Sequence, residues 1–190
     1  MRLIGIFLGM AFSTVVHASD LASSLESVEE SIETKSYRQA LKELNQAEEA
    51  VAVSTEVAVS EQSARIFLYR GTVERLRGDT KGRTMEAWRA ALIVYNDLEW
   101  DSRFLGEGDA WSLFEALRTE VRSYRSRDLG IPEKVGAAVF YVDGVKYGHG
   151  DKVIDGLHLA QIQCDDGVIR GRWVEFDSAL DWFALCPGGV

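Results

Sequence analysis

The stretch AVFYVDGVKYGHGDKVIDGLHLAQIQC, from Ala138 to Cys164, decides the fold class because it differs from all of the chain before it. Asp-Gly pairs separate short runs of Val, Tyr and Ile, which is the pattern of strands joined by tight turns. The pairs Asp143-Gly144 and Asp166-Gly167 suit such turns, because a tight hairpin needs positive φ at its central residues. We therefore predict strands over residues 137–142, 157–164, 168–176 and 180–185.

The chain before this stretch repeats its apolar side chains at helical spacing, from Ser19 to about Arg127. The first stripe starts at Leu21 and ends at Ile32, with apolar residues four, three and four apart. Four more stripes follow, and Gly and Asp residues lie in the connections, where helices usually end. We therefore predict an α+β fold, in which about five helices arranged as hairpins precede a small antiparallel β-sandwich.

The composition is that of an ordinary globular protein with an acidic balance. The 190 residues are 46% hydrophobic and carry a formal net charge of -9. Nucleic-acid binding needs clustered Lys and Arg side chains to contact phosphates, and no basic stripe is present in the sequence. We therefore expect no nucleic-acid partner.

Residues 1–18, MRLIGIFLGMAFSTVVHA, have the pattern of a secretory signal peptide that is cleaved after Ala18. Arg2 precedes an apolar run over residues 3–16, which is too short for a comfortable membrane span. We expect a periplasmic or otherwise exported protein with no transmembrane segment in the mature chain. Removing Arg2 from the 21 basic residues leaves 20 against 30 acidic ones, a net charge of -10.

Cys164 and Cys186 are the only two cysteines in the chain. In an oxidising compartment they are expected to form a disulfide, which would close a loop of roughly twenty residues and stabilise the fold by about 3 kcal/mol in the chain-entropy model. A zinc site would also have to recruit His149 or His158, and no CxxC or HxxxH spacing supports that alternative. We therefore expect no metal at the cysteines.

The Asp and His residues of the opening stretch are also candidates for a metal or catalytic site. Asp143, Asp151 and Asp155 are spaced by eight and four residues, and the intervening ligands of a calcium loop are missing. His158 lies between two leucines and is expected to be a packed strand residue, whereas His149 lies between two glycines and is the more available ligand. Because the chain also lacks a GxSxG elbow, we expect no enzyme and no cofactor.

Three helical segments resemble the tetratricopeptide repeat family. YRQALKELNQA (37–47) matches the second helix of one repeat, and LYRGTVERLRGD (68–79) matches the first helix of another, with Gly71 at the small position. AWRAALIVYNDLEWD (87–101) matches the second helix of that repeat, although the Pro that the family places after it is absent. The resemblance implies a scaffold that holds peptides or partner proteins on a concave face. Four aromatic residues are our candidates for partner contact: Tyr69, Trp88, Tyr95 and Trp111.

The C-terminal part resembles the PEGA domain, a small bacterial β-sandwich named for a Pro-Glu-Gly-Ala signature. Residues 132–137, PEKVGA, contain that signature with two residues inserted. VFYVDGVKYG (139–148) matches the family's strand and Asp-Gly turn, and DGLHLAQIQC (155–164) matches its Gly-x-His strand. The resemblance implies an extracytoplasmic binding or structural module without established catalytic residues.

We divide the chain into a signal peptide (1–18), a tetratricopeptide-like helical domain (19–129) and a PEGA-like β module (130–190). This combination is typical of exported envelope proteins of Gram-negative bacteria. We expect a non-enzymatic adaptor or scaffold whose partner is an envelope protein or peptide. The alternative is a module that binds glycan or peptidoglycan, the cell-wall polymer, through four aromatic residues: Tyr141, Tyr147, Trp173 and Trp182.

Overall fold

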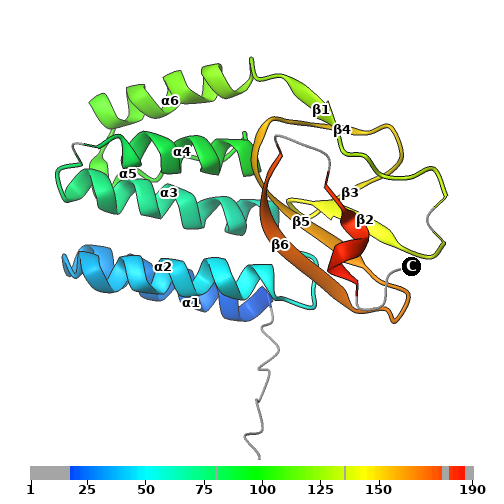
Figure 1. Cartoon of the computed structure of the whole chain (residues 1–190). Coiled ribbons are helices and arrows are strands. Elements are labelled where there is room, and N and C mark those ends of the chain that lie inside the picture. Colours follow the sequence, from blue (N-terminus) through cyan, green and yellow to red (C-terminus); the bar gives the residue numbers. More distant parts are fainter. Residues whose placement is uncertain (1–17, 80, 135, 177–179, 187–190) are drawn as a thin grey trace, which may run out of the picture.

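The computed structural model describes residues 18–79, 81–134, 136–176 and 180–186. Apart from Ala18, the expected signal peptide lies outside these residues. The fold is α+β, as predicted, with helices in the N-terminal part and antiparallel strands after them (Figure 1). None of the helices in the described ranges is both long and apolar enough to cross a membrane.

Six helices form the first part of the described chain, and five of them are longer than one turn. They are α1 (Ala18–Glu33), α2 (Tyr37–Ala52), α3 (Ser60–Leu76), α4 (Arg83–Val94), α5 (Ser102–Leu105) and α6 (Asp109–Val121). The helical stripes read from the sequence face inward: Leu21 and Ile32 of α1 are buried, as are Leu44 and Val51 of α2. Helices α1 and α2 pack together as a hairpin, α3 and α4 form a second hairpin, and α6 lies on α4 (Figure 1).

Helices α3 and α4 approach each other closely where Gly71 faces Trp88. A Cβ atom at Gly71 would lie 2.3 Å from Cδ1 of Trp88, so only glycine fits there. The indole Nε1 of Trp88 donates a hydrogen bond to the Leu68 carbonyl at 3.2 Å, and its ring meets Trp100 and Phe114 edge to face. This aromatic cluster forms the centre of the helical core.

The strands form two antiparallel sheets. The first pairs β1 (Ser126–Asp128) with β4 (Lys152–Ile154), and the second has the order β3-β2-β5-β6. The remaining strands are β2 (Val139–Val142), β3 (Val145–Tyr147), β5 (Gly156–Gln163) and β6 (Ile169–Phe176). The two predicted Asp-Gly hairpins are confirmed, because residues 143–144 join β2 to β3 and residues 166–167 lie in the turn between β5 and β6.

Two features of this part differ from the sequence prediction. The predicted strand over residues 180–185 is wrong: Trp182–Leu185 forms a 3-10 helix, η1, capped by the Asp181 carboxylate, which accepts a hydrogen bond from the Ala184 amide. A run rich in apolar and aromatic residues indicated a strand, but the cap and the burial of Trp182 favour a helical turn. Strand β1 also precedes the boundary that we placed between residues 129 and 130, so the β structure begins earlier than expected.

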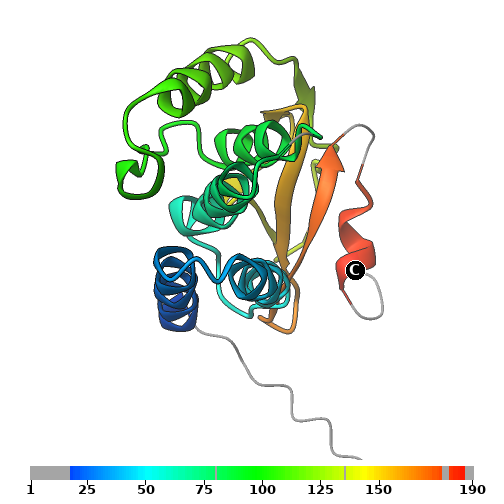
Figure 2. The ribbon, with the colours of Figure 1, turned by 90° about the vertical axis from the view of Figure 1, so that its left-hand side faces the viewer.

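The four-stranded sheet stands across one end of the helices (Figures 1 and 2). Strand β5 is buried along most of its length, and its Leu159 belongs to the helical core. Trp173 of β6 meets Phe67 of α3 edge to face, with ring centroids 5.0 Å apart, and donates a hydrogen bond to the Glu48 carbonyl of α2. The helices and the sheet therefore share one apolar core.

Polar side chains fix the sheet to the loop between α2 and α3. The amide of Gln161, which is fully buried, accepts from the Ala58 N–H and donates to the Glu56 carbonyl, each at 3.0 Å. Ser60, at the start of α3, donates to the Asp143 carbonyl. The next residue, Gly144, has φ +79° and lies against Ala58 so closely that a Cβ atom would be 2.1 Å from its carbonyl oxygen.

The other face of the sheet covers a second, smaller apolar cluster. Phe140 and Phe176 of the sheet pack there against Trp182 of η1, which donates a hydrogen bond to the Leu129 carbonyl at 2.8 Å. The cluster is thus bounded by the sheet, by the chain that leads into it and by the C-terminal turn.

Candidate interaction surface

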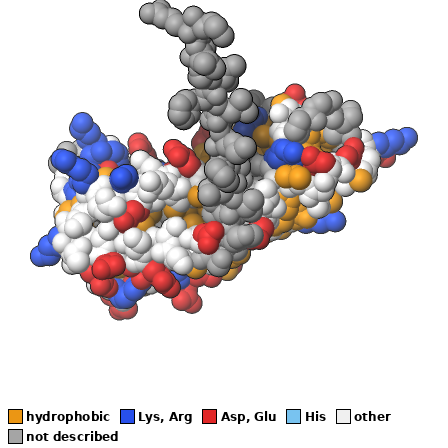
Figure 3. Space-filling model, turned by 90° about the horizontal axis from the view of Figure 1, so that it is seen from below, with side chains coloured by type: hydrophobic (Ala, Val, Ile, Leu, Met, Phe, Trp, Pro, Cys, Tyr) orange, Lys and Arg blue, Asp and Glu red, His pale blue; other side chains and the backbone are white. Residues whose placement is uncertain are grey.

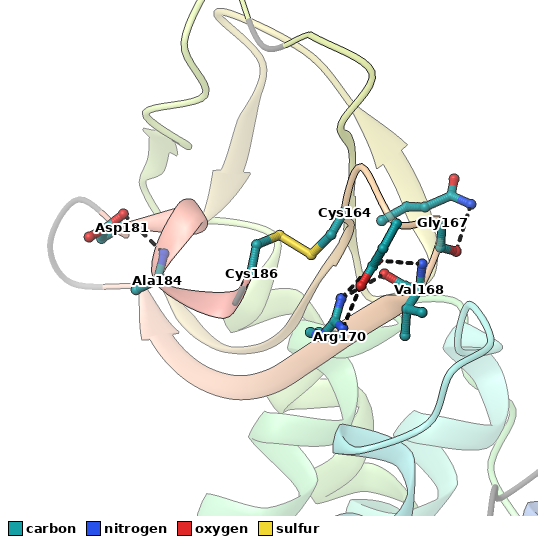
Figure 4. The surroundings of a disulfide bond; sticks show 9 residues. Cys164, Gly167, Val168, Arg170, Asp181, Ala184 and Cys186 are labelled. Atoms are coloured by element: carbon teal, nitrogen blue, oxygen red, sulfur yellow. Dashed lines mark hydrogen bonds and ion pairs between the residues drawn. A yellow bond between two sulfur atoms is a disulfide. The ribbon is translucent and has the colours of Figure 1, made fainter. Parts of the chain in front are cut away.

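The disulfide predicted from the sequence is present. Cys164, at the end of β5, is bonded to Cys186, which follows η1 (Figure 4). The bond closes the second apolar cluster and holds η1 against the sheet. Beside it, Arg170 forms an ion pair at 2.7 Å with Asp166, and this hydrogen bond lowers the pKa of Asp166 to about 2. Both cysteines are consumed by the disulfide, so they offer no metal ligands.

The four aromatic candidates for partner contact lie in different surroundings. Tyr69 and Trp88 are completely buried in the helical core, so neither side chain offers surface to a partner. Tyr95 is half-buried, and only Trp111, at the start of α6, is substantially exposed, at 43%. We correct the sequence interpretation for the two buried residues, because their aromatic rings contribute to packing between helices.

Tyr69 anchors a polar network between α1, α3 and α5. Its hydroxyl donates to the Glu29 carboxylate at 2.5 Å, and Arg103 joins that carboxylate, at 2.8 Å, to Asp101, at 2.5 Å. The hydrogen bond from Arg103 lowers the pKa of Glu29, whereas burial and the Glu29 carboxylate raise the pKa of Tyr69. The network ties α5 to the first hairpin and forms one end of a surface recess.

That recess lies between α1 and the start of α3. It has a volume of about 300 Å³, and Ala22 and Leu25 of α1 contribute apolar surface to it. Val59, just before α3, also lines it and is 46% exposed. Ligand sites in proteins are concave and lined mostly by apolar side chains with a few polar groups. We call this hollow the α1–α3 recess.

Charged and polar groups surround the α1–α3 recess. Glu29 and Glu61 are each paired with an arginine, whereas Glu26 has no ion pair or hydrogen bond within the described residues. The side-chain oxygen of Gln62 is buried and has no hydrogen-bond partner there. A buried acceptor without a donor costs free energy, so Gln62 is a strained polar group beside the recess.

Helix α1, which forms one wall of the recess, is acidic. Helix α1 contains five acidic residues and no Lys or Arg. Seen from the side on which α1 and α2 lie, Asp and Glu side chains are spread over the helical part, and hydrophobic side chains gather on the β part (Figure 3). The recess therefore combines apolar lining residues with charged ones, three carboxylates and Arg65.

Asp143 and His158 form a buried pair that the sequence analysis did not connect. Nδ1 of His158 lies 2.5 Å from the Asp143 carboxylate, and its Nε2 lies 2.8 Å from the Ile154 carbonyl. The Asp143 carboxylate and the Ile154 carbonyl both accept hydrogen bonds from the ring of His158. The His158–Asp143 pair therefore holds one proton more than a neutral ring beside a carboxylate would. Burial lowers the pKa of His158, but the hydrogen bond and the charge of Asp143, together with the hydrogen bond to Ile154, outweigh it, so the pKa is raised. Burial also raises the pKa of Asp143.

The other groups weighed as metal or catalytic residues have structural partners. Asp151 accepts from the Gly148 amide, Asp155 forms an ion pair with Arg127, and Nδ1 of His149 lies 2.8 Å from the Ile131 carbonyl. Among the described residues, no cluster of His, Cys, Asp and Glu could hold a metal ion.

The aromatic residues weighed for glycan binding do not form an exposed platform. Trp182 is buried in the second cluster, and Trp173 is engaged by Phe67. Tyr141 and Tyr147 are half-buried. A glycan platform needs accessible ring faces, so the structure gives this alternative no specific support.

No protein-family model, curated protein or solved structure matches this chain. The interpretation of the surface consequently depends on the contacts described above. Sequence reasoning missed the α1–α3 recess, although the acidic, Lys- and Arg-free stretch 18–33 was a visible signal for one of its walls. No pattern in the sequence indicates that the side-chain oxygen of Gln62 lacks a hydrogen-bond partner within the described residues, because that depends on how the helices pack.

Proposed function

We propose that this protein is a non-enzymatic, exported adaptor of the cell envelope that binds a partner protein in the α1–α3 recess. The observation that carries the proposal is the combination, in one hollow, of apolar lining from Ala22 and Leu25, the exposed Val59 and the Glu26 carboxylate, which has no ion pair within the described residues. A peptide backbone supplies N–H donors and its side chains fill apolar hollows, so a protein segment suits this surface. The tetratricopeptide-like character of residues 37–101 is part of the proposal.

Two further observations support the exported, non-enzymatic part of the proposal. The Cys164–Cys186 disulfide fits an oxidising compartment. Both ring nitrogens of His158 are engaged with acceptors inside the protein, so this residue has no free nitrogen to serve as a general base. A PEGA-like β module that contributes to structure and not to catalysis agrees with both.

Site-specific photo-crosslinking tests the binding surface. A photoreactive side chain replaces Val59, which lines the recess, and in a second variant it replaces Val53, which is 71% exposed and does not line the recess. In cells of the source organism we expect a discrete protein adduct from position 59 and none of the same mass from position 53. The same adduct pattern at both positions, or no adduct at position 59, would contradict the proposal.

Affinity measurements with the purified partner then test whether the recess itself recognises the partner or is only close to it. Val59→Asp places a charge on the apolar side of the recess, and we expect it to weaken binding at least tenfold. Val53→Asp is the matched control and should change the affinity less than twofold. Equal effects of the two substitutions would show that the recess is not the binding surface.

A further inference from the structure

Strand β6 forms one edge of the four-stranded sheet. Its eight residues pair with β5 on one side, and no strand among the described residues pairs with it on the other. The opposite edge is β3, which has only three residues. An open edge exposes backbone N–H and C=O groups that another chain can pair with, so the longer edge is the stronger candidate for such pairing.

The hydrogen bonds around β5 show which groups of β6 point outward. Cys164 donates to the Val168 carbonyl, and Asp143 of the other neighbouring segment donates to the Leu159 carbonyl. Hydrogen-bonded pairs alternate along an antiparallel ladder, so the even-numbered residues of β5 bond to β6 and the odd-numbered ones to β2. The backbone groups that point away from β5 therefore belong to Ile169, Gly171, Trp173 and Glu175.

The charges on this edge disfavour two of the registers in which a second copy could pair. Antiparallel pairing of two β6 strands with full overlap of residues 169–175 would place Arg172 directly opposite Arg172 of the other copy. A shift that centres the pairing on Gly171 would place Arg170 opposite Arg172. Like charges directly opposite one another destabilise a strand pair. Arg170 is neutralised by Asp166, whereas Arg172 is exposed and has no ion pair within the described residues.

The helical side of this edge offers a second contact. Phe67, which meets the ring of Trp173, also lines a groove of about 300 Å³ between α3 and α4. Ala87 and Ala90 of α4 contribute apolar surface to that groove. Every second side chain of an added strand would point toward the helices, because side chains alternate between the two faces of a sheet.

We propose that β6 accepts an extended segment of a partner protein as a fifth strand, with an Asp or Glu side chain opposite Arg172. The partner's backbone pairs with the four outward-facing residues of β6. Its carboxylate pairs with Arg172 on the face that also carries η1. This surface is separate from the α1–α3 recess and uses backbone pairing instead of a side-chain hollow.

A displayed library of random twelve-residue peptides, selected on the oxidised full-length mature chain, tests the proposal. We expect enriched peptides with an acidic residue and without proline at the centre. Glu175→Pro removes one outward N–H group, and Glu175→Ala keeps it; the first should weaken binding at least tenfold and the second less than twofold. Arg172→Gln should weaken binding at least threefold.

A measurement on the peptide itself keeps the test decisive if Glu175→Pro does not fold. N-methylation at alternate peptide residues should abolish binding at one set of positions and leave the other set unaffected. No enrichment, equal binding to both Glu175 variants, or uniform tolerance of N-methylation would each overturn the proposal. A dimer in sedimentation that Arg172→Gln strengthens would instead assign the edge to a second copy and overturn the choice of occupant. Val59→Asp should leave peptide binding unchanged, which separates this test from that of the recess.

Discussion

The helical part and the β part bury their apolar side chains differently and leave different kinds of surface free. The helices enclose the larger core, with Trp88 at its centre, and expose a hollow lined by side chains. The sheet covers a smaller cluster that is closed by a disulfide, and it exposes a backbone edge. Helices satisfy most of their backbone hydrogen bonds internally, so they recognise partners through side chains, whereas a sheet edge also offers its backbone.

The size of the two cores explains where the covalent link lies. A small cluster releases less free energy on burial, so a disulfide contributes a larger share of its stability. The helical core has no such link among the described residues and depends on packing. This contrast can be tested by substitutions in each part and at the contact between the sheet and the α2–α3 loop. We call this contact, in which Gly144 and Gln161 meet Ala58, the joint.

The largest expected effect is in the helical core. Trp88→Ala removes a fully buried ring that contacts Gly71 and Phe114, and we expect a loss of about 3–5 kcal/mol in the free energy of unfolding, measured by urea denaturation. Trp111→Ala is the matched control on the surface and should cost less than about 1 kcal/mol. Comparable losses for the two variants would contradict the assignment of Trp88 to the core.

The second expected effect is in the smaller cluster. Replacing Cys164 and Cys186 together by alanine should lower the free energy of unfolding by about 2–4 kcal/mol. Hydrogen exchange should then accelerate in β5, β6 and η1 more than in α3 and α4. The unreduced, denatured wild-type protein should contain no titratable thiol, and two titratable thiols would contradict the disulfide.

The third expected effect is at the joint. Gly144→Ala combines a strained positive φ with a Cβ atom 2.1 Å from the Ala58 carbonyl, and it should cost about 1–3 kcal/mol. Gly136→Ala is the matched control, because φ is +59° there and nothing lies within 4 Å of the added atom. The difference between the two variants in thermal unfolding measures the contact itself. Equal losses would mean that the joint is looser than described.

The smallest expected effect is a pH dependence. The pKa of His158 is raised above its usual value of 6.5, so the pair with Asp143 stabilises the fold most below that pH, and the contribution is lost as pH rises through the folded-state pKa. Asp143→Asn keeps an acceptor for the Leu159 amide and donates to a neutral ring, so the decline in the free energy of unfolding above pH 6.5 should become shallower. An unchanged slope between wild type and variant would contradict the shared proton.

The parts of the fold that depend on local pattern could be predicted from the sequence. Helical spacing located the helices, and Asp-Gly pairs located two turns. The joint could not be predicted, because Gln161 and Ala58 are far apart in the chain and become neighbours only after folding. For the same reason, the aromatic character of Tyr69 and Trp88 did not tell us that both are buried. The recess could not be predicted either, because Gln62 loses its hydrogen-bond partners only when the helices pack.

Hydrogen exchange tests the central claim most directly, since the claim places the partner in the α1–α3 recess. The measurement uses the partner that crosslinking identifies, bound non-covalently to the chain that keeps Val59. We predict slower exchange in residues 22–29 of α1 and 59–65 at the start of α3, with Val59→Asp abolishing the change. Slower exchange confined to other described segments, with these two unchanged, would contradict the account.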